Sequence, residues 1–118
     1  MQKVLGIGGI FFKASNPEAL SNWYADNLGV TMAPAKEGDV EWQQQAGPTV
    51  FAPMEIGAEH FKKDAKLYIN FRVQDLAAMT KQLEDAGIHV ELDKDEYSYG
   101  KFANLEDPEG NQIQLWES

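Results

Sequence analysis

The sequence predicts an α+β fold of two tandem βαβββ modules, which together form a concave cup of mixed β-sheet. Three observations lead to this prediction. The chain of 118 residues is 43% hydrophobic, which suits one compact domain with a sizeable core. A segment of the first half recurs in the second half. In each copy, the two-residue period of a strand changes into the spacing of a helix.

The repeat matches residues 10–30 to residues 69–88, and Phe12 aligns with Phe71, half a chain length away. An offset of half the chain favours two modules of equal size. The predicted organisation is a single domain over residues 1–118, with module one at about 1–57 and module two at about 64–118.

Module one is predicted to open with a strand over residues 4–14, which are rich in β-branched and aromatic side chains. A helix follows, because Asn16 can cap it and Pro17 suits its first position. Gly29 stands where a left-handed residue ends a helix. Three short strands are expected to complete the module, at residues 31–33, 40–45 and 49–54.

Module two repeats this order. A strand is predicted over residues 66–73, and Asp75 can cap the helix that follows. Gly87 marks the end of that helix. Three strands are again expected, at residues 89–93, 101–105 and 112–117.

One helix per module cannot cover both faces of a sheet, so the uncovered faces are predicted to line the cup. Alternation assigns Ile69 and Phe71 to the helix side, and Asn70 and Arg72 to the concave side. Aromatic walls with a few directed polar groups are typical of small-molecule pockets. An alternative is that these side chains pack together and close the cup without a cavity. The predicted ligand-binding residues are Phe51, Tyr68, Asn70, Arg72, Gln112, Gln114 and Trp116.

Charge and composition exclude several classes of function. Ten basic and nineteen acidic side chains give a net charge of −9, which argues against nucleic acid as a partner and leaves a cationic ligand possible. No apolar run reaches the roughly 18–20 residues of a membrane span. Cysteine is absent and no signal-peptide pattern is seen, so we expect a cytoplasmic protein.

The segments NWYADNLGV, INFRVQDL and DPEGNQIQLWE, within duplicated βαβββ modules, resemble the vicinal oxygen chelate superfamily, also called glyoxalase/bleomycin resistance/dioxygenase proteins. The resemblance covers essentially the whole chain. It implies the concave-cup fold and, in the enzymes of the family, a divalent metal held on the concave face. The corresponding ligand positions fall here on Gly9, Phe51, Tyr68 and Gln114. Only Gln114 could coordinate, through a neutral amide oxygen, so no metal site is predicted.

Metal-free members of this superfamily bind drugs or other small molecules and are commonly dimers, and this sequence looks closer to them. The resemblance therefore implies metal-independent binding of a small organic ligand by a homodimer. The alternative is a metal-dependent glyoxalase-like lyase or isomerase, or a dioxygenase, in which swapped modules or a shifted register bring in His89, Glu91 or Glu109. A third possibility is an interaction module whose concave face meets a protein.

Overall fold

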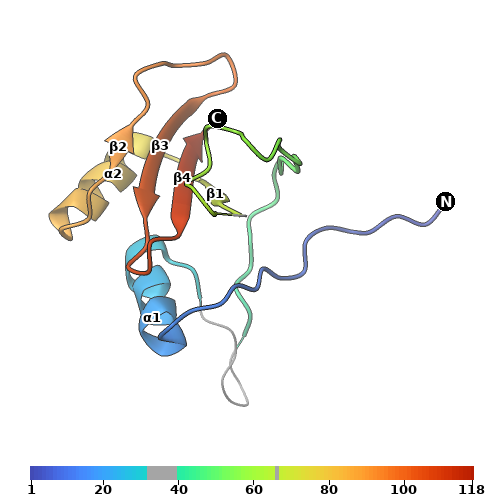
Figure 1. The fold of residues 1–118 in the computed structure, drawn as a ribbon, viewed down its shortest axis with the longest axis horizontal. Helices are drawn as coiled ribbons and strands as arrows, with labels where there is room; N and C mark the ends of the chain where they lie inside the picture. Colours follow the sequence, from blue (N-terminus) through green and yellow to red (C-terminus); the bar gives the residue numbers. More distant parts are fainter. Residues whose placement is uncertain (32–39, 66) are drawn as a thin grey trace.

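The computed structural model describes residues 1–31, 40–65 and 67–118. Four strands form one mixed sheet in the order β1-β4-β3-β2, in which β1 is parallel to β4 and the other pairs are antiparallel (Figure 1). The α+β class is confirmed, and module two has the predicted order of strand, helix and three strands. The elements are α1 (Pro17–Leu28), β1 (Ile69–Arg72), α2 (Leu76–Asp85), β2 (Glu91–Leu92), β3 (Lys101–Glu106) and β4 (Gln112–Glu117).

The sheet has one apolar face, which the strand alternation creates. The register places Phe71 of β1 and Ala103 of β3 opposite Leu115 of β4. Leu115 and Ile113 are fully buried between the strands and the helices. Removing such side chains from water is the main favourable term in folding this layer, at about 1.5–3 kcal/mol for each large one.

Helix α2 packs against this apolar face. Asp75 caps it by accepting a hydrogen bond from the Ala78 amide at 3.0 Å, as the sequence predicts. Leu76 and Leu83 are its buried apolar residues, and Gly87 follows the helix with φ +83°. The Asp75 cap and Gly87 therefore define the two ends of α2, and the spacing of Leu76 and Leu83 defines its buried face.

Helix α1 belongs to module one but packs into the same core. Asn16 caps it through the Ala19 amide at 3.1 Å, and Gly29 closes it in the left-handed region with φ +70°. Leu20 and Tyr24 are buried in one cluster with residues of the sheet and α2. In Figure 1 the helix lies next to the turn that joins β3 to β4. The two modules thus share one hydrophobic core.

The strands expected in module one differ from the structure. Residues 4–14, 40–45 and 49–54 form no strand within the described part of the chain. A strand is stable only with a hydrogen-bonded neighbour, and these segments do not pair with one another. The first residues instead run outward from the helices and sheet (Figure 1). Of the strand expected at residues 31–33, residues 32 and 33 lie outside the described residues.

No helix within residues 1–31, 40–65 and 67–118 is long and apolar enough to span a membrane.

Candidate functional site

The face of the sheet opposite the helices gathers most of the predicted site. Alternation along β1 and β4 turns these side chains away from the buried core, and most of those on β4 are half-buried. The predicted residues that share this concave face are Asn70, Arg72, Gln112, Gln114 and Trp116.

An amide pair lies on this face. Asn70 and Gln114 are opposite each other in the parallel pairing of β1 with β4, and Asn70 Nδ2 donates to Gln114 Oε1 at 2.8 Å. The bond uses one donor and one acceptor. Within the described residues, the Asn70 amide oxygen and the Gln114 amide nitrogen make no other side-chain hydrogen bond. The pair therefore offers an acceptor and a donor to a ligand.

Aromatic rings flank the amide pair along the strands. Trp116 stacks on Phe102 of β3, with ring centroids 6.1 Å apart and planes 6° apart. Trp116 Nε1 donates to the Tyr99 carbonyl at 2.8 Å, which ties the indole to the loop before β3. In that loop, Tyr97 and Tyr99 stack with centroids 5.1 Å apart. The two tyrosines meet Phe102 edge-on, so the four rings form an aromatic cluster beside the polar amides.

Phe102, Tyr97 and Tyr99 were not among the predicted site residues. Alternation in the strand over 101–105 would have placed Phe102 on the same face as Trp116. The two tyrosines carried no such signal, because only the folded loop brings them to the sheet. Nearby charge raises the pKa of the exposed Tyr97 hydroxyl, with Asp93 as the largest contributor.

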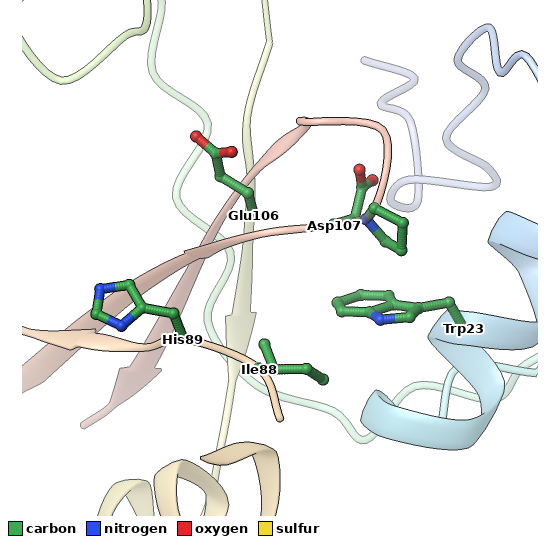
Figure 2. A pocket seen from close by; sticks show the side chains of 6 residues that line it. Trp23, Ile88, His89, Glu106 and Asp107 are labelled. Atoms are coloured by element: carbon green, nitrogen blue, oxygen red, sulfur yellow. The ribbon is translucent and has the colours of Figure 1, made fainter. Parts of the chain in front are cut away.

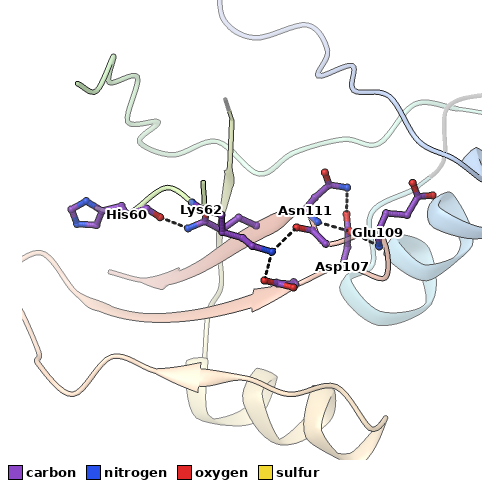
Figure 3. A network of polar contacts seen from close by, with 8 residues as sticks. His60, Lys62, Asp107, Glu109 and Asn111 are labelled. Atoms are coloured by element: carbon purple, nitrogen blue, oxygen red, sulfur yellow. Dashed lines mark hydrogen bonds and ion pairs between the residues drawn. The ribbon is translucent and has the colours of Figure 1, made fainter. Parts of the chain in front are cut away.

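The Gln112 side chain hydrogen-bonds to the linker between the modules and is not free to contact a ligand. Its Oε1 accepts from the Lys62 amide at 3.1 Å, and its Nε2 donates to the His60 carbonyl. Lys62 Nζ in turn contacts Glu106 Oε1 at 2.5 Å and the Gly110 carbonyl at 3.3 Å (Figure 3). Gln112 therefore fixes the linker to the edge of the site, and its amide is already used.

Arg72 is similarly occupied. Its guanidinium donates to the carbonyls of Gln45 at 2.7 Å and Ala46 at 3.5 Å. A Cβ added at Gly47 would collide with this guanidinium, so the end of the Arg72 side chain would have to shift to admit a larger residue there. Arg72 fastens residues 45–47 to the end of β1.

Tyr68 and Phe51 lie at the margin of the predicted set. Tyr68 comes directly before β1 and meets Phe61 edge-on, with ring centroids 5.0 Å apart. Phe51 is 84% exposed, and the structure does not bring it to the other site residues. Its expected place on the concave face depended on a strand over residues 49–54, which does not form here.

Among the residues that the structure describes, the acidic and histidine side chains do not gather into a site for a divalent metal. Within residues 1–31, 40–65 and 67–118, no group of three or more His, Asp or Glu side chains could hold one. Glu109 is used elsewhere, because its carboxylate accepts from the amides of Ser15 at 2.6 Å and Asn16 at 3.0 Å. His89 Nε2 has Glu91 Oε1 at 3.5 Å, which is a pair and not a set of metal ligands.

A separate open cavity of about 370 Å³ lies where α1 meets the β3–β4 turn (Figure 2). Figure 2 shows Trp23 facing His89 and Glu106 across it, with Ile88 between them. The Asp107 carboxylate at its edge is already bonded to Tyr24 at 2.7 Å. No sequence pattern indicates this cavity, because its lining residues come from separate segments: Trp23, Ile88, His89, Glu106, Asp107 and Pro108.

A family model described as a glyoxalase-like domain matches residues 9–116. This chain belongs to the glyoxalase-like domain family. The resemblance stated from the sequence motifs is thereby confirmed at the level of the family. The search of curated proteins returned no match.

Solved structures share the fold of this glyoxalase-like chain. Lactoylglutathione lyase from Agrobacterium tumefaciens has a TM-score of 0.59 and 17% identity, covering 99% of this chain and 96% of that one. TnmS3, an antibiotic binding protein from Streptomyces sp. CB03234, has a TM-score of 0.57 and 19% identity, covering 88% of each chain. A glyoxalase/bleomycin resistance protein from the same Streptomyces strain has a TM-score of 0.53 and 20% identity, covering 86% of this chain and 91% of that one. At such identities the likeness concerns the fold, which hosts many activities.

Proposed function

We propose that this glyoxalase-like protein binds a small organic ligand on the concave face of its sheet, without a metal. The observation that carries the proposal is the Asn70–Gln114 amide pair, bonded at 2.8 Å, next to the stacked rings of Trp116 and Phe102. The aromatic rings supply apolar contact area, and the remaining amide donor and acceptor orient the ligand.

The chemistry of this face favours a ligand with a planar ring and a hydrogen-bonding edge. The ring would lie on Trp116, since stacked aromatic contacts add about 0.5–1.5 kcal/mol beyond area burial. The net charge of −9 favours a cationic or weakly basic ligand through long-range attraction. A fold shared with TnmS3, which is described as an antibiotic binding protein, supports the same class of function.

Independence from metal is part of the proposal. By the resemblance of the sequence motifs, Gln114 corresponds to a position where metal-using relatives place a carboxylate, and a neutral amide is a weak ligand for hard cations. The alternative is a metal-dependent glyoxalase-like lyase or isomerase, or a dioxygenase. Elemental analysis of protein purified without a chelator separates the two. Stoichiometric Ni, Zn, Fe or Mn would contradict the metal-free proposal.

The proposal also includes a homodimer and a cytoplasmic location. The sequence-level resemblance supports the dimer, and the absence of cysteine supports a reducing compartment. Light scattering on the purified chain measures the oligomeric state directly.

The central test is a thermal-shift screen against basic, neutral and acidic aromatic compounds. A ligand that binds only the native state raises its stability by about 2.7 kcal/mol at a hundredfold excess over Kd. We expect Gln114→Leu to weaken binding of the best compound, and His89→Ala, in the separate cavity, to leave it unchanged. If His89→Ala weakened binding and Gln114→Leu did not, the ligand would bind in that cavity and not on the concave face. A screen without any shift would contradict ligand binding.

A further inference from the structure

The open cavity between α1 and the β3–β4 turn lies where the pairing of β2 with β3 stops. The last residue pair toward the turn joins Glu91 to Asn104. The same register, continued by two residues, would place His89 opposite Glu106. Figure 2 shows these two residues on separate segments, on opposite sides of the cavity. The cavity of about 370 Å³ is therefore also a gap in the hydrogen bonding of the sheet.

The backbone of Glu106 directs its hydrogen-bonding groups into this gap. Along an antiparallel strand, successive residues direct their N–H and C=O to opposite neighbours. The Phe102 carbonyl accepts from the Asp93 amide at 2.9 Å, on the side of β2. Glu106 lies four residues further along β3, so its N–H and C=O face the same side and point toward His89. Within the described residues, the main-chain groups of Glu106 and His89 do not bond to each other.

Hydrogen bonds outside the gap hold its two sides apart. On one side, the Ile88 amide donates to the Leu83 carbonyl at 3.0 Å, which ties the segment after α2 to the end of that helix. On the other side, the Asp107 amide donates to the Asn111 carbonyl at 3.0 Å, within the β3–β4 turn. Both segments are thus directed away from each other by their own local bonds, and the gap is part of the fold.

Apolar side chains form the walls of the cavity. Trp23 of α1 is half-buried and packs edge-on against Tyr24, with ring centroids 5.1 Å apart. Ile88 and Pro108 line the same space. In Figure 2 the Trp23 ring extends from α1 toward Ile88. The cavity therefore offers an aromatic ring and aliphatic surface next to main-chain donors and acceptors.

The charged side chains that line the cavity already have partners. Glu106 contacts Lys62 at 2.5 Å, and His89 contacts Glu91 at 3.5 Å. The buried Asp107 carboxylate accepts a hydrogen bond of 2.7 Å from α1. A ligand in the cavity would thus meet backbone groups and not an unpaired charge, which favours a neutral molecule.

We propose that this cavity is a second ligand site, which takes a compact neutral ring containing a cyclic amide. The Glu106 N–H donates to the amide oxygen of the ring, and the Glu106 carbonyl accepts from its N–H. Both bonds are needed, because a molecule that displaces water from polar groups loses affinity unless it replaces the hydrogen bonds of that water. The ring packs against Trp23. The site is independent of the function proposed for the concave face, where the net charge favours a cationic ligand.

Two matched compounds test the site. Isoquinolinone is a neutral bicyclic lactam, and its N-methyl derivative keeps the rings and the carbonyl but lacks the N–H. Each is titrated into the ¹⁵N-labelled chain and followed by NMR. We expect the lactam to shift the amide signals of Glu106 and His89 and the indole signal of Trp23. The N-methyl compound should bind about tenfold more weakly, because one hydrogen bond is lost.

Equal binding of the two compounds would overturn the proposal, since the amide edge would then contribute nothing. The absence of any shift at millimolar lactam would overturn it as well. Shifts confined to Asn70, Gln114 and Trp116 would also contradict it, and would support binding on the concave face instead. The two sites can therefore fail separately.

A pair of variants gives a second readout. Trp23→Leu removes the aromatic wall and should weaken lactam binding about tenfold. Trp42→Leu is the matched control, because Trp42 does not line the cavity, and it should bind the lactam like the wild type. Equal weakening in both variants would contradict a site at Trp23. If Trp23→Leu does not fold, the comparison of the two compounds on the wild-type chain still decides the proposal.

Discussion

The hydroxyl of Tyr24 donates a hydrogen bond of 2.7 Å to Oδ2 of Asp107, and both residues are buried. Asp107 also accepts from the Glu109 amide at 2.9 Å and from the Asn111 amide at 3.0 Å. Its carboxylate thus shapes the turn between β3 and β4, while Tyr24 joins that turn to α1. Burial, the hydrogen bond to Asp107 and its negative charge all raise the pKa of Tyr24, in that order of size.

Replacing Tyr24 by Phe should destabilise the fold by about 1–3 kcal/mol, because it removes a buried hydrogen bond to the Asp107 carboxylate, whose Oδ2 then keeps only the Asn111 side-chain amide as a donor. Urea unfolding followed by circular dichroism measures the change. Tyr99→Phe is the matched control, since Tyr99 is 58% exposed. Equal stability of the two variants would show that the buried bond contributes nothing.

The raised pKa of Tyr24 predicts a loss of stability in alkali. The folded state holds this proton more tightly than the unfolded state, whose tyrosine titrates near 10.0. The contribution is therefore complete below pH 10 and is lost as the pH rises above it. Unfolding free energies measured from pH 8 upward should fall more steeply for the wild type than for Tyr24→Phe. Parallel curves would contradict the assignment.

The lowered pKa of Glu109 predicts a loss of folding stability at acidic pH. The amides of Asn16 and then Ser15 lower the pKa of this exposed carboxyl from its ordinary value of 4.5. Its contribution is present above pH 4.5 and disappears as the pH falls through the lowered value. Glu109→Gln should therefore flatten the acid limb in thermal melts from pH 6 to pH 3. Glu84→Gln, an exposed change on α2, should retain the wild-type slope.

Gly100 predicts a local effect on the aromatic surface. Its φ is +133°, and an added Cβ would collide with the Glu117 carbonyl and the Trp116 indole. Gly100→Ala should cost about 1–3 kcal/mol through backbone strain, and should change the near-ultraviolet circular dichroism of Trp116. Gly57→Ala is the control, because a Cβ at Gly57 meets nothing within 4 Å. An unchanged Trp116 signal would mean that the loop adapts without moving the indole.

The sequence predicted the elements whose signals are local. Asn16 and Asp75 cap the two helices, and the last strand occupies the predicted residues 112–117, because caps and alternation depend on neighbours in the chain. Strands over 4–14 and 49–54 also had the right pattern, but a strand needs a partner that pattern alone does not supply.

In the candidate site, too, the contacts that depend on local alternation could be predicted, and those that depend on distant segments could not. Asn70 and Gln114 were placed by alternation and meet on adjacent strands, as their positions implied. The use of Gln112 by the linker and of Arg72 by the Gln45 carbonyl could not be predicted, because each depends on segments distant in sequence. Whether the face binds a ligand stays a prediction.

Helix α1 of module one completes the core of module two, and this determines which fragments of the chain can fold. The sequence repeat invites a cut near residue 58, as if each half were an independent folding unit. A fragment of residues 64–118 would lose Leu20 and Tyr24, and would leave Asp107 without the hydroxyl that binds it. The two halves share a sequence pattern, but neither should fold independently. If a protease separates them, neither half should keep its native structure.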